Sequence, residues 1–100
     1  MLHVDDSIVR ELRMLAMRFQ VEKIVLFGSR ARGDHHSRSD IDLAVWGIHD
    51  AVRYLDFQEA VEEQIPTLLC FDLVDMEGFC VSDALRDEIG KDGVVIYEKI

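Results

Sequence analysis

Long apolar runs are missing from this sequence, and their absence limits where the protein can reside. No stretch approaches the roughly 18 consecutive apolar residues that a membrane span needs. The first residues are polar and acidic, which is unlike a secretory signal peptide. We therefore expect a cytoplasmic protein without membrane contacts.

Cysteine is scarce, with two residues in the whole chain. Cys70 and Cys80 do not form a CxxC pair, so no zinc or dithiol motif of that kind is present. Cys70 lies inside an apolar run, which predicts a small core residue rather than a ligand. The spacing leaves a disulfide open, although nothing else in the sequence indicates an oxidising compartment.

Basic residues are few: 11 lysines and arginines stand against 20 aspartates and glutamates, and the formal net charge is −9. Proteins that bind nucleic acid through its phosphates usually carry a basic face, so this composition argues against nucleic-acid binding. Any phosphate-bearing ligand would have to bring counter-cations. Repeats and linker-like stretches are absent from the 100 residues, which predicts one domain spanning residues 1–100.

What the sequence does contain is an alternation of helical and strand patterns. Apolar residues at helical spacing, bounded by capping residues or proline, predict helices over residues 6–20, 50–65 and 82–89. Short apolar or alternating runs predict strands over residues 23–27, 40–46, 68–75 and 94–97. Helices that alternate with strands around one sheet define an α/β domain.

The helix predicted over residues 50–65 has two interpretations. Its apolar side chains, among them Val52 and Leu55, follow a helix-like pattern and are expected to pack in the core. The alternative is a docking face that includes Tyr54, Phe57 and Glu62.

Two aspartates stand at alternate positions of the second predicted strand. Residues i and i+2 of a strand point to the same face, so Asp40 and Asp42 project side by side while Ile41 and Leu43 point into the core. Neighbouring anions repel each other unless a cation lies beside them, and hard oxygen ligands suit Mg²⁺. The alternative for an Asp-x-Asp pair alone is two solvated aspartates at a strand edge.

A glycine and a serine follow directly after the first predicted strand. Gly28 allows a ligand to approach the backbone closely, and Ser29 with nearby backbone N–H groups would form a phosphate cradle. The alternative is an ordinary turn between a strand and a loop. The next residues include Arg30, Arg32 and Arg38, a basic segment in an acidic chain that favours an anionic ligand, with Arg32 as the preferred arginine.

The third predicted strand carries a carboxylate in an otherwise apolar stretch. Asp72 has Phe71 and Leu73 as neighbours, and burying an unpaired charge there would be unfavourable unless a metal stabilised it. With a bound metal, Asp72 could accept the proton of an attacking hydroxyl. Asp75 is the competing carboxylate, but it stands at the end of the strand, where solvation is easy.

These features together fit phosphoryl chemistry. Two metal ions can hold the attacking and leaving oxygens of an in-line displacement at phosphorus, and the reaction then needs positioning and charge neutralisation more than covalent help. Magnesium would also explain how an acidic protein binds a polyphosphate.

The pattern of Gly28-Ser29, ten intervening residues and then Asp40-x-Asp42, with the strand around Asp72, resembles a known signature. It is similar to that of the DNA polymerase β-like nucleotidyltransferase superfamily and, within it, of the minimal (MNT) nucleotidyltransferases. The likeness covers essentially the whole chain, although the first and last quarters match only in pattern. It implies a polymerase β-like fold, with a mixed sheet of about four strands flanked by helices.

The resemblance implies roles for the site residues. Asp40, Asp42 and Asp72 would be the catalytic and metal-binding residues for two Mg²⁺ ions, and Asp72 would also help to activate the acceptor. The residues expected to bind the triphosphate of ATP, the arginines because of the basic segment, are Gly28, Ser29, Arg30 and Arg32.

The resemblance also implies a partner. Many minimal members are encoded beside a small helical HEPN protein, and in such modules the nucleotidyltransferase can act as an antitoxin that adenylylates a tyrosine of the HEPN toxin. We expect an adenylyltransferase of this kind. The alternatives are nucleotidyl transfer to a small molecule and an antitoxin that acts by contact alone. The substitution Asp42→Asn distinguishes an enzyme, which it would inactivate, from a binder, which it would leave nearly unchanged.

Overall fold

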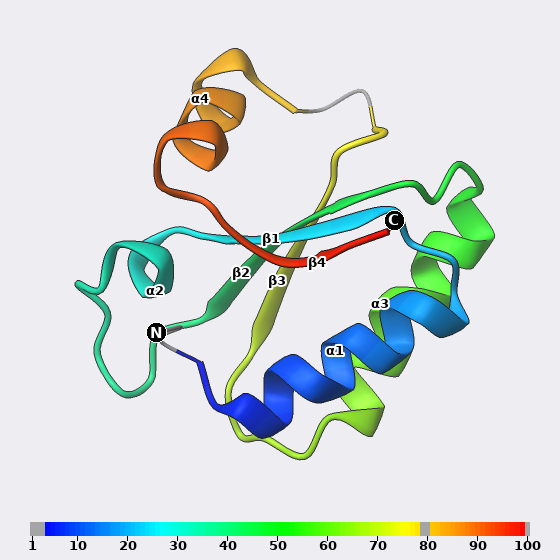
Figure 1. The fold of residues 1–100 in the computed structure, drawn as a ribbon, viewed down its shortest axis with the longest axis horizontal. Helices are drawn as coiled ribbons and strands as arrows, with labels where there is room; N and C mark the ends of the chain where they lie inside the picture. Colours follow the sequence, from blue (N-terminus) through cyan, green and yellow to red (C-terminus); the bar gives the residue numbers. More distant parts are fainter. Residues whose placement is uncertain (1–3, 79–80, 100) are drawn as a thin grey trace.

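The computed structural model describes residues 4–78 and 81–99, and these form helices and strands that alternate along the chain (Figure 1). The elements are α1 (Asp6–Arg18), β1 (Lys23–Phe27), α2 (Ser29–Arg32), β2 (Ile41–Trp46), α3 (Ala51–Gln64), β3 (Phe71–Asp75), α4 (Asp83–Asp92) and β4 (Val94–Glu98).

The four strands make one mixed sheet in the order β3-β2-β1-β4. Strand β1 runs antiparallel to both β2 and β4, whereas β2 and β3 are parallel and are joined through α3. Helices α1 and α3 cover one face of the sheet, and the short helix α4 lies over the other (Figure 1). The predicted fold, a mixed sheet of four strands flanked by helices, is confirmed.

Strand β1 is apolar on both faces because each face packs against helices. Ile24 and Leu26 belong to the larger cluster formed with α1 and α3. Val25 and Phe27 belong to a smaller cluster on the side of α4. Burying each such side chain stabilises the fold by about 1.5–3 kcal/mol, which explains why a continuous apolar run, rather than an alternating one, marks this strand.

The third strand is shorter than the sequence predicted. Strand β3 begins at Phe71, and the preceding residues form a loop in which Leu68 and Cys70 are exposed. The prediction of a buried Cys70 was therefore wrong, because the chain needs these residues to travel from the end of α3 to the sheet. Cys80, the other cysteine, lies outside the described residues.

Helix α3 also differs from its prediction in the side chains it buries. Phe57 is buried, but Val52 and Leu55, expected in the core, are 67% and 61% exposed. A period of 3.6 residues places Val52 and Leu55 on the side of the helix opposite Phe57. The pattern located the helix correctly and misassigned its buried face. Among the residues that the structure describes, no helix is long and apolar enough to cross a membrane.

Candidate active site

The site begins at the tight turn between β1 and α2. Gly28 has a φ of 75°, a conformation that other residues adopt with strain. A β-carbon at this position would collide with the carboxylate of Asp42, whose Cγ would lie 3.2 Å away. The Gly28 carbonyl accepts hydrogen bonds from the N–H groups of Ala31 and Arg32, both at 3.1 Å, and so closes the turn. Only glycine therefore lets the backbone that precedes Ser29 approach Asp42 this closely.

The sheet brings two of the predicted carboxylates together. Asp42 of β2 and Asp72 of β3 are direct partners in the parallel register. Ile41 and Leu43 are fully buried on the face of α1 and α3, so Asp42 points to the opposite face, as the alternation predicted. Asp40 stands one residue before β2 and is exposed.

The environment of Asp72 differs from the one expected. Its side chain is exposed rather than buried among apolar neighbours. Strand β3 lies at an edge of the sheet, and α4 covers only part of this face, so water reaches the carboxylate. The argument from buried charge was wrong, but the residue it selected does stand opposite Asp42.

Asp42 is the most perturbed carboxylate in the site. Burial is the main reason why its pKa is raised to about 6. The negative charges of Asp72 and Asp40, and then that of Glu88, raise the pKa further, as does a side-chain hydrogen bond with Asp72. A fold gains nothing from crowding anions in this way, whereas a divalent cation would relieve the repulsion.

The donor set fits magnesium by its chemistry. Carboxylate oxygens are the ligands that Mg²⁺ prefers, and the remaining positions go to water and phosphate oxygens. Within residues 4–78 and 81–99, no three His, Cys, Asp or Glu side chains are already grouped so that they could hold a metal ion. Asp40 and Asp72 are exposed, so rotation of their side chains is sterically open.

The two arginines predicted to bind phosphate have different surroundings. Arg30 is buried, and its guanidinium donates from Nε to the Ser39 carbonyl at 3.0 Å and from an Nη to the Ser37 carbonyl at 3.4 Å. It therefore fixes the loop that leads to Asp40. Arg32 is exposed and pairs with Asp34 and Glu88, both at 3.1 Å.

Glu88 was not predicted as a site residue. It comes from α4, which lies on the same face of the sheet as Asp42 (Figure 1), and its charge contributes to the raised pKa of Asp42. No sequence signal marks it, because α4 is rich in acidic residues at exposed positions, among them Asp83 and Asp87.

Tyr54 of α3 was predicted only as part of a docking face. Its hydroxyl is buried, with no hydrogen-bond partner among the described residues. Burial, followed by the charges of Asp75 and Asp72, raises the pKa of this phenol to about 12. Tyr54 is thus a neutral, partly buried side chain that packs against the larger core. Its hydroxyl is not exposed on the surface for contact with another molecule.

A pocket of about 570 Å³ lies next to Asp40. The loop before β2 forms one wall, and the loop before β3 forms the other. The residues that line it are Ser37, Arg38, Asp40, Leu68, Leu69 and Cys70. The sequence assigned the last three to a strand, so this cavity could not be foreseen.

The family of the chain follows from its sequence as a whole. The profile of the family described as "Polymerase beta, Nucleotidyltransferase" matches residues 11–100. The chain belongs to this family and is a nucleotidyltransferase. No curated protein matches it.

Several solved structures are similar to the chain in fold, among them two complexes of a toxin with an antitoxin. One is a toxin–antitoxin complex with AMP-PNP, with a TM-score of 0.70 at 23% identity over 91% of this chain and 73% of that one. The other is a tri-AMPylated HEPN toxin of Shewanella oneidensis in complex with an MNT antitoxin, with a TM-score of 0.65 at 20% identity over 92% of this chain and 71% of that one. At these identities the likeness shows the shared nucleotidyltransferase fold.

Proposed function

We propose that this protein transfers AMP from ATP to a hydroxyl of a HEPN-type partner toxin, most simply a tyrosine, and acts as its antitoxin in the cytoplasm. The observation that carries the proposal is the pairing of Asp42 with Asp72 directly beside the Gly28 turn. Membership of the nucleotidyltransferase family supports the chemistry. The two similar structures, one with AMP-PNP and one with an AMPylated HEPN toxin, support the choice of nucleotide and partner.

Each site residue then has a role. Ser29 binds the triphosphate together with backbone groups of the turn at Gly28. Asp40, Asp42 and Asp72 hold the Mg²⁺ ions, two in number, which when bound supply the positive charge that the triphosphate and the carboxylates need. Arg32, the exposed arginine, contacts phosphate directly, whereas Arg30 acts through the loop that it fixes.

The exposed edge position of Asp72 suits a proton acceptor for a hydroxyl that arrives on another protein. The acceptor oxygen attacks the α-phosphorus, and a new phosphorus–oxygen bond forms as the bond to the bridging oxygen of the β-phosphate breaks. Pyrophosphate leaves with the electron pair of that bond. The proton of the hydroxyl passes to Asp72 and then to solvent.

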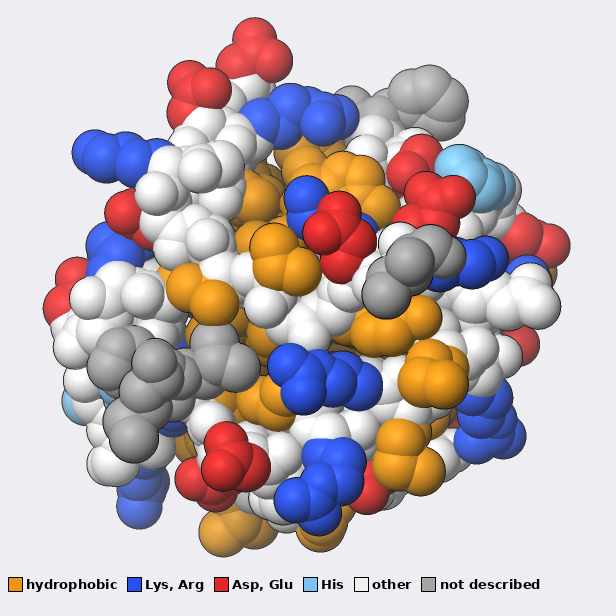
Figure 2. Space-filling model, in the orientation of Figure 1, with side chains coloured by type: hydrophobic (Ala, Val, Ile, Leu, Met, Phe, Trp, Pro, Cys, Tyr) orange, Lys and Arg blue, Asp and Glu red, His pale blue; other side chains and the backbone are white. Residues whose placement is uncertain are grey.

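A protein acceptor is favoured by the surface. Large hydrophobic side chains remain exposed on both helices that cover one face of the sheet: Met14 and Met17 on α1, and Val52 and Leu55 on α3. Exposed apolar side chains that gather into a patch mark sites of protein contact. Acidic and basic side chains are interspersed on the face shown in Figure 2, without the continuous basic surface that a nucleic-acid acceptor would call for.

The test is the intact mass of the protein encoded next to this one after incubation with the chain, Mg²⁺ and ATP. We expect a gain of one or more AMP units with the wild type and none with Asp42→Asn. Asp75→Asn is the matched control, because it makes the same aspartate-to-asparagine change at the last residue of β3, which has no role in the proposed site. This variant should retain transfer. Folding of each variant is checked by circular dichroism.

Other results would select the alternatives. A stable complex without any mass gain, with ATP or another nucleoside triphosphate, would indicate an antitoxin that acts by contact. Consumption of ATP to pyrophosphate with a small hydroxyl compound, but not with the protein, would indicate a small-molecule acceptor.

A further inference from the structure

An ion pair joins helix α4 to the segment around α2. Arg32 Nη1 and Glu88 Oε1 are 3.1 Å apart, although the two residues are 56 positions apart in the sequence. The Nε atom of Arg32 is bonded to Asp34 Oδ2, also at 3.1 Å. The Arg32 guanidinium, which we propose contacts the phosphate of the nucleotide, therefore already binds two carboxylates.

The two partners of Arg32 differ in one respect. Asp34 lies two residues away on the same segment and can move together with Arg32. Glu88 belongs to a separate helix, and its charge reaches Asp42 at the centre of the site. Glu88 is thus a negative charge at the site that none of the assigned roles uses.

A triphosphate that binds beside Ser29 would meet Glu88 in two ways. It would be repelled by the carboxylate, and it would compete with that carboxylate for Arg32. Arginine binds carboxylate and phosphate with the same donor geometry, so one group can replace the other.

We propose that Glu88 competes with the triphosphate for Arg32, so that Arg32 exchanges Glu88 for phosphate when the nucleotide binds. Glu88 is thus a positioning residue that acts through Arg32. It weakens the affinity of the site for the substrate and for pyrophosphate alike. The inference rests on the proposed function, because it requires a nucleoside triphosphate at Ser29.

The test is calorimetric titration of the full chain with Mg²⁺ and AMP-PNP. Glu88→Gln keeps the shape of the side chain and removes its charge, and we expect a dissociation constant about three- to tenfold lower than that of the wild type, in line with a partly exposed ion pair. The KM for ATP should fall with it, without a loss of kcat.

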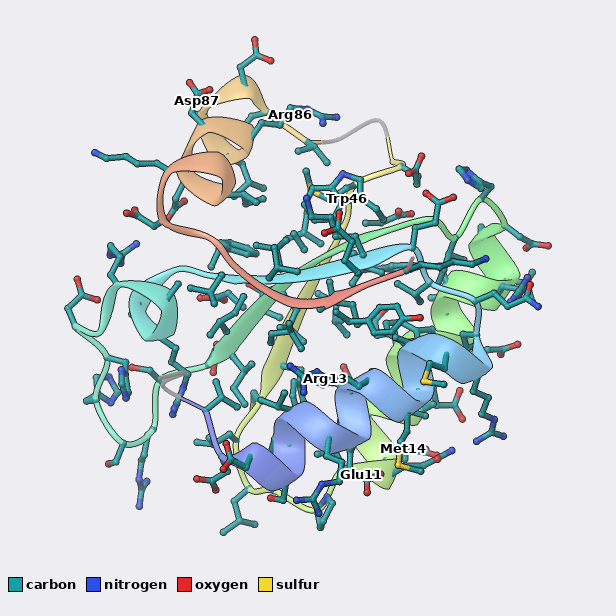
Figure 3. The ribbon with its side chains drawn as sticks, viewed as in Figure 1. Glu11, Arg13, Met14, Trp46, Arg86 and Asp87 are labelled. Carbon is teal, nitrogen blue, oxygen red and sulfur yellow. The ribbon has the colours of Figure 1, made fainter. Side chains whose placement is uncertain are left out.

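Asp87→Asn is the matched control. Asp87 adjoins Glu88 on α4 but stands on the outer side of the helix, away from the sheet (Figure 3). The Asp87→Asn substitution removes one negative charge from α4 without touching Arg32. It should therefore change the dissociation constant for AMP-PNP by less than about twofold. In an Arg32→Ala background, the gain from Glu88→Gln should become smaller, because competition for Arg32 is removed and only the direct repulsion of the triphosphate by Glu88 remains.

Three results would overturn the inference while leaving the proposed function in place. Equal affinity of wild type and Glu88→Gln would reduce the pair to a surface contact. Weaker binding by Glu88→Gln would mean that Glu88 holds Arg32 ready for phosphate. A large loss of kcat at unchanged affinity would make Glu88 part of the reaction itself. A wild type that binds no nucleoside triphosphate would contradict both the inference and the proposed function.

Discussion

At the scale of single residues, Asp42 is a carboxylate that the fold holds in an unfavourable place. It is half-buried and faces Asp72, with Asp40 and Glu88 close enough to disfavour its charge. An asparagine of the same shape would avoid this repulsion. The expected compensation is a bound cation, so the site should reduce the stability of the metal-free protein.

This reasoning predicts a stabilised variant. The pKa of Asp42 is raised from 3.8 to about 6 in the folded chain, so the folded state binds more protons than the unfolded state between these values. The free energy of unfolding of the wild type therefore falls as the pH rises from about 4 to about 6. In the presence of a chelator at pH 7.5, Asp42→Asn should be more stable by about 1 kcal/mol, after allowing for solvent screening.

Chemical denaturation at several pH values measures this effect. The advantage of Asp42→Asn should shrink as the pH falls and vanish below about pH 3, where the wild-type carboxyl is protonated in both states. Asp56→Asn, at an exposed position of α3, should show no comparable gain at any pH. A variant less stable than the wild type at pH 7.5 would mean that the Asp42 carboxylate forms favourable contacts in the apo protein.

At the scale of elements, the turn between β1 and α2 is constrained at Gly28. Replacing Gly28 with alanine introduces strain at a positive φ and a collision with Asp42. We expect Gly28→Ala to lose at least about 1 kcal/mol of stability and to reduce AMP transfer by tenfold or more. Thermal melts and initial transfer rates measure the two effects.

Gly90 provides the comparison for that substitution. It lies within α4, and a β-carbon there would have nothing within 4 Å. Gly90→Ala should therefore raise the stability by about 0.5–1 kcal/mol through helix propensity and leave transfer intact. Equal effects of the two substitutions would show that the close approach of Gly28 to Asp42 does not matter.

The elements also differ in how far the sequence could predict them. The two faces of strand β2 were predicted, because Ile41 and Leu43 alternate with the aspartates and only one of the two faces can enter the core. Strand β3 was predicted too long, since a run of apolar residues in a loop has the same composition as a buried strand. Asp72 was found through its sequence context, but its exposure depends on the strand being at an edge of the sheet, which no local pattern contains.

At the scale of the whole molecule, the two faces of the sheet have different tasks. Helices α1 and α3 seal one face and form the larger core. The ten-residue helix α4 covers the other only in part, which leaves Asp42 and Asp72 accessible and brings Glu88 to Arg32. Contacts of this kind join distant segments, so Glu88 could not be predicted from periodicity or motifs.

The net charge of −9 is also a property of the whole molecule, and it affects the binding of charged ligands. An acidic chain repels a free triphosphate, and the crowded aspartates at the beginning of β2 add to that repulsion. Binding should therefore depend on a divalent cation, which neutralises ligand and protein together.

If the chain acts as we propose, it breaks the bond between the α- and β-phosphates of ATP and moves AMP to its partner protein. The most direct measurement compares ATP labelled at the α-phosphate with ATP labelled at the γ-phosphate, each incubated with Mg²⁺, the chain and the partner. We expect the α-label to become attached to the partner and the γ-label to appear in pyrophosphate, and we expect Asp42→Asn to abolish both. Attachment of γ-label, or the absence of attached label despite complex formation, would contradict the proposal.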